Sequence, residues 1–159
     1  MIVKNKYPIP QIADLFEQLR RAKYFSKLDL RSGYYQVRIA KRDESKTACV
    51  TRYRAYEFKV MPFGLTNASA TFCTIMNRIF QPYLDQFVLV YLDDIMVYSN
   101  TLVEHVEHLW VMFGVLRDNE LYVKWEKCSF AKPEVGFLGH KIREGTLLID
   151  KAKVRVIAK

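Results

Sequence analysis

Long apolar runs are missing from this sequence of 159 residues. No stretch reaches the roughly 18 consecutive apolar residues that mark a membrane-spanning helix, so we expect no membrane partner. The segment from Met1 to Pro10 carries Lys4 and Lys6 but no apolar run, so it does not form a secretory signal. Internal repeats, low-complexity segments and convincing linkers are missing too, which favours one domain over residues 1–159.

Cysteine is scarce, with only Cys49, Cys73 and Cys128. Their odd number, their wide spacing and the lack of a CxxC pair argue against a disulfide framework and against a zinc site. A reducing, intracellular compartment is therefore expected. The sequence also lacks a GxxxxGK[ST] phosphate loop and an evident Ser-His-Asp set, so neither of those chemistries is indicated.

Acidic residues are in deficit, with 17 Asp and Glu against 25 Lys and Arg, which gives a formal net charge of +8. That excess suits a polyanionic partner such as nucleic acid, although a basic surface without such a partner explains it equally well. Aromatic residues are plentiful, with ten Tyr, ten Phe and two Trp. Aromatics beside basic residues can stack on bases, but at this density most are expected in the core.

The first half of the chain predicts one helix and several strands. Hydrophobic periodicity indicates a helix over residues 11–22 and a short strand over residues 25–30. Alternation along that strand puts its leucines on one face and Lys27 and Asp29 on the other, so a core beneath the leucines leaves Asp29 on the open side. The composition of residues 34–61 favours strands over 34–40 and 47–61, with a turn near Tyr53 to Ala55.

The second half predicts two amphipathic helices and more strand. Residues 87–98 hold two apolar runs on either side of Asp93-Asp94, which indicates a hairpin, and a final strand is expected over 134–142. Together these elements predict an α+β fold, with helices packed on one face of an antiparallel sheet. The first helix covers residues 68–83, and the second, with a capping box at Thr101 and Glu104, is marked by Leu102, Val106, Leu109, Phe113 and Leu116.

Asp93 and Asp94 are two adjacent carboxylates between apolar strands, and Asp29 ends another apolar strand. Aspartate is common in turns for purely structural reasons. Converging strand-end carboxylates are also what a hard divalent cation needs, and two such ions about 4 Å apart can drive phosphoryl transfer. Spacing alone leaves both interpretations open.

Four ordered motifs give a more specific indication. Phe25 to Ile39 (FSKLDLRSGYYQVRI) resembles the first catalytic motif of reverse transcriptases, and Met61 to Phe72 (MPFGLTNASATF) is similar to the second. Tyr91 to Asp94 matches the Tyr-x-Asp-Asp signature, and Phe137 to His140 resembles the primer-grip motif. The resemblance covers nearly the whole chain and is strongest to gypsy-type long-terminal-repeat retrotransposons.

This resemblance implies a right-hand polymerase palm with part of the fingers. The implied activity is RNA-directed DNA synthesis, in which two-metal nucleotidyl transfer adds deoxynucleotides to a primer 3′-hydroxyl. The implied partners are an RNA template, a DNA primer and deoxynucleoside triphosphates, normally with fusion to RNase H and integrase in a polyprotein. The implied cofactor is a pair of Mg²⁺ ions, with Mn²⁺ as a possible substitute, held by the catalytic residues Asp29, Asp93 and Asp94.

The family pattern also implies further site residues. Tyr34 matches the steric gate that rejects a 2′-hydroxyl, and the Leu30 carbonyl would face a metal. The nucleotide pocket would be lined by Phe63 and Gly64, with Lys127 near the leaving phosphate. The primer grip would comprise Phe137, Leu138, Gly139 and His140.

The sequence departs from the family pattern at Ser69, where Pro is usual, and at Arg54, where Gly is usual. The leading fingers segment, the thumb and RNase H are expected to be absent, so this fragment alone should be poorly active. A truncated non-catalytic remnant that folds and binds nucleic acid weakly is the first alternative. Others are a metal-free basic nucleic-acid-binding module and a palm polymerase that makes RNA, which Tyr34 disfavours. His105 and His108 lack a third ligand at metal spacing and are expected on a solvated helix face.

Overall fold

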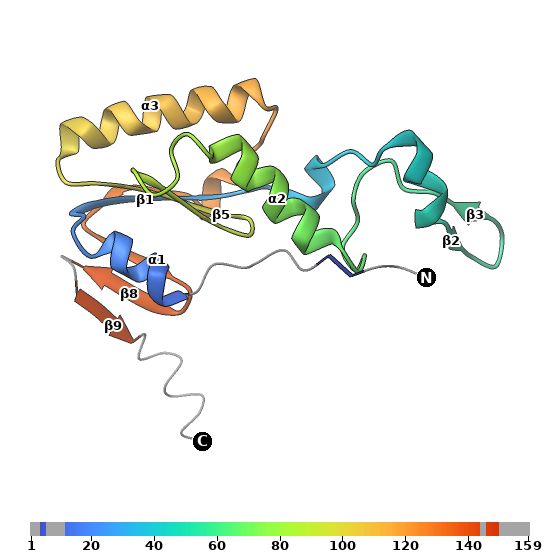
Figure 1. Cartoon of the computed structure of the whole chain (residues 1–159), viewed down its shortest axis with the longest axis horizontal. Coiled ribbons are helices and arrows are strands. Elements are labelled where there is room, and N and C mark those ends of the chain that lie inside the picture. Colours follow the sequence, from blue (N-terminus) through green and yellow to red (C-terminus); the bar gives the residue numbers. More distant parts are fainter. Residues whose placement is uncertain (1–3, 6–11, 144–145, 150–159) are drawn as a thin grey trace, which may run out of the picture.

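The computed structural model describes residues 4–5, 12–143 and 146–149. Within them the central sheet is antiparallel with the strand order β4-β5-β1-β6, and separate sheets are formed by β2-β3 and by β7-β8-β9 (Figure 1). None of the described helices is long and apolar enough to cross a membrane. The elements are α1 (Ile12–Leu19), β1 (Tyr24–Asp29), η1 (Gly33–Gln36), η2 (Lys41–Thr47), β2 (Cys49–Val50), β3 (Ala55–Tyr56), α2 (Ala68–Phe80), β4 (Val88–Tyr91), β5 (Asp94–Ser99), α3 (Leu102–Asp118), η3 (Trp125–Lys127), β6 (Ser129–Lys132), β7 (Glu134–Phe137), β8 (His140–Arg143) and β9 (Thr146–Ile149), where η denotes a 3-10 helix.

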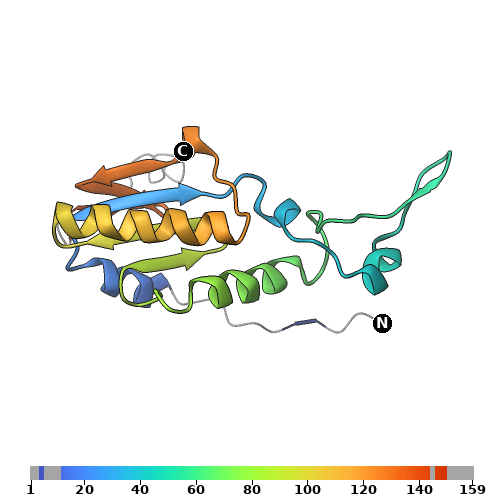
Figure 2. The ribbon, with the colours of Figure 1, turned by 90° about the horizontal axis from the view of Figure 1, so that it is seen from above.

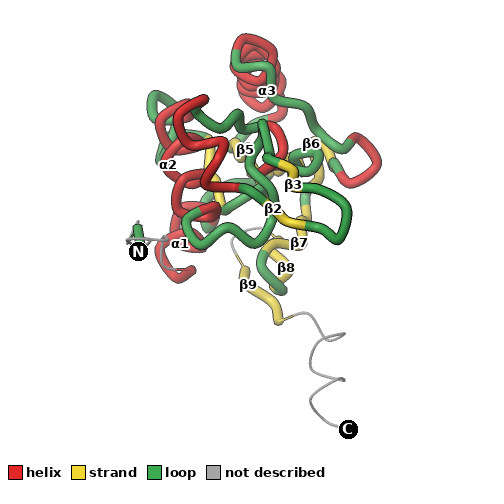
Figure 3. The backbone as a smooth tube through the Cα atoms, turned by 90° about the vertical axis from the view of Figure 1, so that its right-hand side faces the viewer, coloured by secondary structure: helices red, strands yellow, loops and turns green. Residues whose placement is uncertain are grey.

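Each face of the central sheet has its own hydrophobic core. On one face, Leu28 and its neighbours pack against α2 and α3 through buried residues such as Phe72 and Met112. On the other face, Phe25 packs with residues of α1, β7 and β8. Figure 3 shows α3 above the central strands and β8 and β9 below them. The predicted α+β fold is confirmed, with α2 and α3 on one face as expected and α1 on the other.

The alternation predicted along β1 is confirmed. Leu28 and Leu30 are buried, whereas Lys27 and Asp29 lie on the opposite face and remain partly exposed. The predicted hairpin around Asp93-Asp94 is also confirmed, because β4 and β5 pair with Tyr91 opposite Asp94. These two elements bring the ends of β1 and β5 together.

The strands predicted over 34–40 and 47–61 are wrong for most of their length. The 3-10 helices η1 and η2 occupy much of this segment, and β2 and β3 contain two residues each. Every residue from 48 to 57 is exposed, so no second layer packs against a longer sheet here. Strand propensity reflects packing on a half-buried surface, and that surface is missing. Figure 2 shows this β2–β3 hairpin reaching away from the body of the molecule.

The single strand predicted over 134–142 is instead a hairpin of β7 and β8. Phe137 pairs with His140, and the turn between them has positive φ at Leu138 (49°) and Gly139 (78°). Glycine adopts such angles at no steric cost, which lets the chain reverse within the motif. An apolar pattern alone does not separate one long strand from two short ones.

The second predicted helix is confirmed as α3, but only Leu109 and Leu116 of its expected apolar stripe pack into the core. Leu102, Val106 and Phe113 are 48, 47 and 37% exposed, whereas Met112 and His105 are fully buried. The expected solvated position of His105 is therefore wrong. The helix carries apolar residues on both sides, and tertiary packing selects the side on which His105 finds hydrogen-bond partners.

Candidate active site

The backbones of the three predicted carboxylate residues converge at one end of the central sheet. Asp29 ends β1 and pairs with Asp94, which begins β5. Leu30 donates its backbone N–H to the carbonyl oxygen of Asp93 at 3.0 Å, and Lys124 donates its backbone N–H to that of Asp29 at 2.7 Å. Residues 64 positions apart in sequence are thus held together by main-chain hydrogen bonds.

The turn that carries Asp93 is strained and tightly packed. Leu92 has φ of 54°, a left-handed conformation that is costly for a side chain of this kind. Gly33 lies directly against the turn: a Cβ atom there would be 3.4 Å from the Cβ of Asp93 and 2.9 Å from the ring of Phe72. Glycine is needed at position 33 because only its missing side chain allows this approach.

Lysine side chains neutralise two of the three carboxylates. The Nζ of Lys27 lies 2.9 Å from Oδ2 of Asp94, and the Nζ of Lys127 lies 3.5 Å from Oδ2 of Asp29. Among the described residues, no three His, Cys, Asp or Glu side chains are grouped so that they could hold a metal ion. The expectation that three carboxylates surround a common point is therefore wrong for these side-chain positions, because Asp29 and Asp94 each turn toward an ammonium group.

The carboxylates nevertheless influence one another. Partial burial raises the pKa of Asp94, Lys27 opposes this rise, and the charges of the other two carboxylates add to it. Only 14% of the Asp29 side chain and 22% of the Asp94 side chain are exposed. This end of the sheet is a partly desolvated region of concentrated negative charge.

An aromatic group follows Gly33, the residue that packs against the turn of Asp93. The ring of Tyr34 lies 4.8 Å from that of Phe63 and 5.1 Å from that of Phe72, between centroids. The hydroxyl of Tyr34 also shares a hydrogen bond of 2.9 Å with the hydroxyl of Ser69. Gly64, next to Phe63, has φ of 95°, which favours glycine. The structure thus brings together three of the predicted nucleotide-pocket residues, Tyr34, Phe63 and Gly64, whereas Lys127 lies beside Asp29.

The side of the chain on which Tyr34 lies differs from expectation. The family's steric-gate position gave Tyr34 the open side of an expected strand, which left the buried side to Tyr35, but these residues belong to the 3-10 helix η1. Tyr34 is half-buried against the core that includes Phe72, whereas Tyr35 is 43% exposed. The centroid of the Tyr35 ring lies 5.5 Å from that of the Phe63 ring.

The predicted primer-grip residues form the β7–β8 turn, on the face of the sheet toward which Phe25 and Met96 point and which Asp29 and Asp94 share. Phe137 is buried and its ring lies 6.4 Å from that of Tyr91, two residues before Asp93. His140 donates from Nδ1 to the carbonyl oxygen of Leu138 at 3.1 Å. The turn is therefore packed directly beneath the hairpin that carries the carboxylates.

Three site residues were missed by sequence reasoning: Lys27, Gly33 and Ser69. The signal for Lys27 was available, because alternation put it on the face of Asp29. Gly33 was interpreted only as the end of a strand. Ser69 was noticed only as a departure from the family pattern, whereas its hydroxyl contacts Tyr34.

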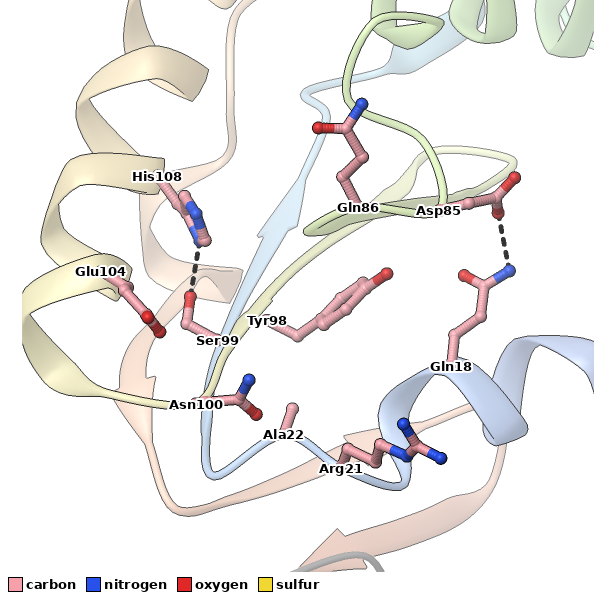
Figure 4. A pocket seen from close by; sticks show the side chains of 10 residues that line it. All are labelled: Gln18, Arg21, Ala22, Asp85, Gln86, Tyr98, Ser99, Asn100, Glu104 and His108. Carbon is pink, nitrogen blue, oxygen red and sulfur yellow. Dashed lines mark hydrogen bonds between the residues drawn. The ribbon is translucent and has the colours of Figure 1, made fainter.

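Two cavities formed by the described residues lie away from the three carboxylates, none of which lines either of them. One, of about 420 Å³, lies near the opposite end of β5 and is shown in Figure 4; Tyr98, Ser99 and His108 contribute to its lining. Beside it, the Oγ of Ser99 lies 2.9 Å from Nδ1 of His105 and 2.7 Å from Nδ1 of His108. The other, of about 820 Å³, lies between η2 and the start of α2.

Comparisons with known proteins agree with this geometry. Residues 1–142 match the family "Reverse transcriptase (RNA-dependent DNA polymerase)". An RNA-directed DNA polymerase homolog of Oenothera berteroana is 65% identical over 69% of this chain and 80% of its own length. The Pol polyproteins of the Drosophila melanogaster transposons 297 and gypsy are 39% and 34% identical over 98% of this chain, which spans only 15% of each.

Solved structures give the same fold. A foamy viral protease-reverse transcriptase bound to double-stranded DNA superimposes with a TM-score of 0.89 at 24% identity, over 100% of this chain and 28% of that one. The same viral protein with an RNA/DNA hybrid gives 0.84 over 99% of this chain and 21% of that one. The fold is that of a polymerase palm. The chain belongs to the reverse transcriptase family, and its relatives are the Pol polyproteins of gypsy-type retrotransposons.

Proposed function

We propose that this chain is the palm-centred core of an RNA-directed DNA polymerase, with part of the fingers. The observation that carries the proposal is the juxtaposition of two groups of residues. Asp29, Asp93 and Asp94 meet at one end of the sheet, Gly33 packs against the turn that carries Asp93, and the next residue, Tyr34, stacks its ring near that of Phe63. Three carboxylates with aromatic rings nearby suit a bound nucleotide. Its phosphates would be coordinated by metal ions on the carboxylates, and its sugar would pack against a ring.

The donor set fits Mg²⁺ in its chemistry. Asp29 and Asp93 would be the main ligands with Asp94 nearby, and carboxylate oxygens are the ligands that this ion prefers. When bound, a pair of such ions activates the primer 3′-hydroxyl and neutralises charge on the leaving phosphate. Mn²⁺ has similar ligand preferences and is the expected substitute. The lysine ammonium groups that now contact Asp29 and Asp94 show that these positions attract positive charge.

The chain's own residues would then position the substrates. The Tyr34 ring, braced by Phe63 and Phe72, would lie under the sugar of the incoming deoxynucleotide and leave no room for a 2′-hydroxyl. Lys127, 3.5 Å from Asp29, is near enough to contact a phosphate that reaches the carboxylates. The β7–β8 turn would support the primer end through its packing on Tyr91.

The partners implied by this function are an RNA template, a DNA primer and deoxynucleoside triphosphates. A net charge of +8 supports binding to polyanions. The transposon relatives are named as Pol polyproteins, which supports a fusion of this chain to further enzymatic domains such as RNase H and integrase. Such a fusion would supply contacts to primer and template that lie outside these residues.

Substitution of the carboxylates tests the proposal. In the polymerase that contains this chain, Asp29→Asn or Asp93→Asn should reduce nucleotide incorporation on the order of a thousandfold, because a ligand to a transition-state metal is lost. The control is Asp118→Asn, which changes an exposed carboxylate at the end of α3. Primer extension with Mg²⁺ measures the effect, and near-normal incorporation by either site variant would contradict the assignment.

A non-catalytic domain that only binds nucleic acid is the second candidate. It is favoured by the absence, among the described residues, of a three-ligand group and by the lysine pairing of two carboxylates. In that case the wild-type polymerase incorporates nothing, whereas Asp93→Asn leaves binding to a primer–template unchanged. Measuring both properties on the same preparations separates the two functions.

A further inference from the structure

Lys27 forms the least exposed ion pair that the described residues contain. Its Nζ lies 2.9 Å from Oδ2 of Asp94, and the two side chains are only 24% and 22% exposed. The neighbouring pair of Lys127 and Asp29 is longer, at 3.5 Å, and the lysine there is 56% exposed. Screening by water is therefore weaker for Lys27 than for Lys127.

The position of Lys27 follows from the pleat and the register of the sheet. Lys27 and Asp29 are two residues apart on β1 and share a face. Asp94 is the cross-strand partner of Asp29, so it lies diagonally opposite Lys27 on that face. A residue of the opposite pleat would point into the core with Leu28. The ammonium group of Lys27 is thus built into the wall of the candidate metal site by strand pairing.

We propose that Lys27 is a positioning residue whose ammonium group partly balances the negative charge of Asp29, Asp93 and Asp94. It holds Asp94 away from the ion that Asp29 and Asp93 bind, and it competes with a divalent ion for the Asp94 carboxylate. Without a cation, three carboxylates at one partly desolvated end of the sheet repel one another. Lys27 removes part of this repulsion in the metal-free protein and weakens metal binding by the same charge. The inference rests on the proposed metal site.

Metal binding by the purified chain tests this role without any polymerase assay. Isothermal titration with Mn²⁺ is carried out on wild type, Lys27→Met and Lys27→Arg, of which methionine keeps the length and arginine keeps the charge. Lys27→Met should bind Mn²⁺ at least about fivefold more tightly, because a competing positive charge is gone. Lys27→Arg should remain close to wild type. Lys127→Met is the matched control and should have the smaller effect, because its ammonium group is more exposed.

Two further measurements separate positioning from a merely structural role. In an Asp94→Asn background, the increase in Mn²⁺ affinity caused by Lys27→Met should shrink by more than half, since the carboxylate that Lys27 holds is gone. Metal-free Lys27→Met should unfold at a lower urea concentration than wild type, and saturating Mn²⁺ should restore more stability to it than to wild type. Lys27→Gln serves if Lys27→Met does not fold.

The outcomes discriminate between this inference and the proposed function. Unchanged or weaker Mn²⁺ binding by Lys27→Met, with normal binding by wild type, overturns the role of Lys27 alone. A gain in Mn²⁺ affinity in Lys27→Arg as large as the gain in Lys27→Met also overturns it, because charge is then not the cause. Failure of wild type and every variant to bind Mn²⁺ overturns both the metal site and the role of Lys27.

Discussion

Tyr34 shows how neighbouring residues hold one side chain in place. Its ring contacts those of Phe63 and Phe72, and its hydroxyl bonds to Ser69. If the ring rejects a 2′-hydroxyl by steric overlap, Tyr34→Ala should raise ribonucleotide over deoxyribonucleotide incorporation by at least tenfold, about 1.4 kcal/mol in differential barrier. Competitive single-nucleotide incorporation by the polymerase that contains this chain measures the ratio.

Tyr35→Ala is the matched control for that experiment. Because Tyr35 is 43% exposed, its loss should leave folding and sugar choice nearly unchanged, in contrast to the buried side that the gate position of Tyr34 left to it. Tyr34→Phe keeps the ring but removes the bond to Ser69, and it should retain most of the selectivity. Unchanged sugar selectivity in Tyr34→Ala would remove Tyr34 from the proposed site.

At the same scale, the sequence placed each carboxylate in its local element, only the family resemblance implied that they converge, and nothing predicted their lysine partners. Asp29 at a strand end and Asp93 in a hairpin turn are local features that alternation and apolar runs reveal. The approach of Lys27 to Asp94 depends on the register between β1 and β5, which are far apart in sequence. Cross-strand register is a property of tertiary structure, so no periodicity within one segment could have predicted that pair.

Among the elements, prediction succeeded where each one buries a face. β1 alternates apolar and polar positions, the β4–β5 hairpin consists of two apolar runs, and α2 has the apolar period of a helix; each packs on a core. It failed for residues 34–61, where tyrosine, valine and threonine suggested strands that have nothing to pack against. It also identified only part of the buried side of α3, because the polar His105 did not count as a core residue.

The capping box at the start of α3 is a local stabilising feature that can be tested. The Glu104 backbone N–H donates to Oγ1 of Thr101 at 3.3 Å, and the Thr101 backbone N–H donates to Oε2 of Glu104 at 3.2 Å. Thr101→Ala removes the first bond and should lower the free energy of unfolding by ~1 kcal/mol. Thr74→Ala, at an exposed position within α2, is the control and should cost nothing. Equal urea midpoints for wild type and Thr101→Ala would contradict the expectation.

The β2–β3 hairpin should contact nucleic acid if the proposed function holds. Tyr53 is 85% exposed, and among the described residues no carboxylate pairs with Arg52 or Arg54. Thr51 fixes the tip by donating its backbone N–H to the Arg54 carbonyl oxygen at 2.9 Å. Exposed arginines beside an exposed ring can hold phosphates and stack on a base.

Replacing two residues of this tip should therefore weaken binding. Arg52→Ala with Tyr53→Ala should reduce the affinity for single-stranded RNA by at least about fivefold and lower the salt dependence by about one charge. Arg117→Ala with Trp110→Ala changes a comparable exposed pair on α3, far from the hairpin in Figure 1, and should have little effect. Equal losses in both double variants would show that the hairpin has no special role. Fluorescence anisotropy of a labelled oligonucleotide measures the affinities.

On the scale of the whole molecule, the two ends of the central sheet differ in chemistry. One end gathers Asp29, Asp93 and Asp94, and the other ends at Ser99 beside His105 and His108. The sheet between them carries a core on each face. The charged end depends on solvent and ions, whereas the histidine end is satisfied internally by hydroxyl groups.

This internal network should make stability depend on pH. His105 is fully buried, and its ring nitrogens share hydrogen bonds with Ser99 at 2.9 Å and Ser26 at 2.7 Å. Burial, with a smaller contribution from His108, lowers the pKa of His105 from 6.5 to about 4. Burial likewise lowers the pKa of His108, against the opposing charges of Glu104 and Glu107. Both histidines therefore stay neutral in the folded protein at pH values where the unfolded chain binds protons.

The sign follows from proton linkage. Above about pH 6.5 both states hold a neutral His105, and the residue adds no pH dependence. Between about pH 6.5 and 4 the unfolded state binds a proton that the folded state does not, so the free energy of unfolding falls as pH falls. The shift in the pKa of His105 corresponds to a loss of up to about 3 kcal/mol in the free energy of unfolding. Urea unfolding of the purified chain at pH 7.0, 6.0, 5.0 and 4.5 measures it, and His105→Gln, which cannot titrate, should show a shallower decline over the same range. Parallel profiles for wild type and His105→Gln would mean that acid unfolding is governed by the carboxylates and that the buried network plays no part in it.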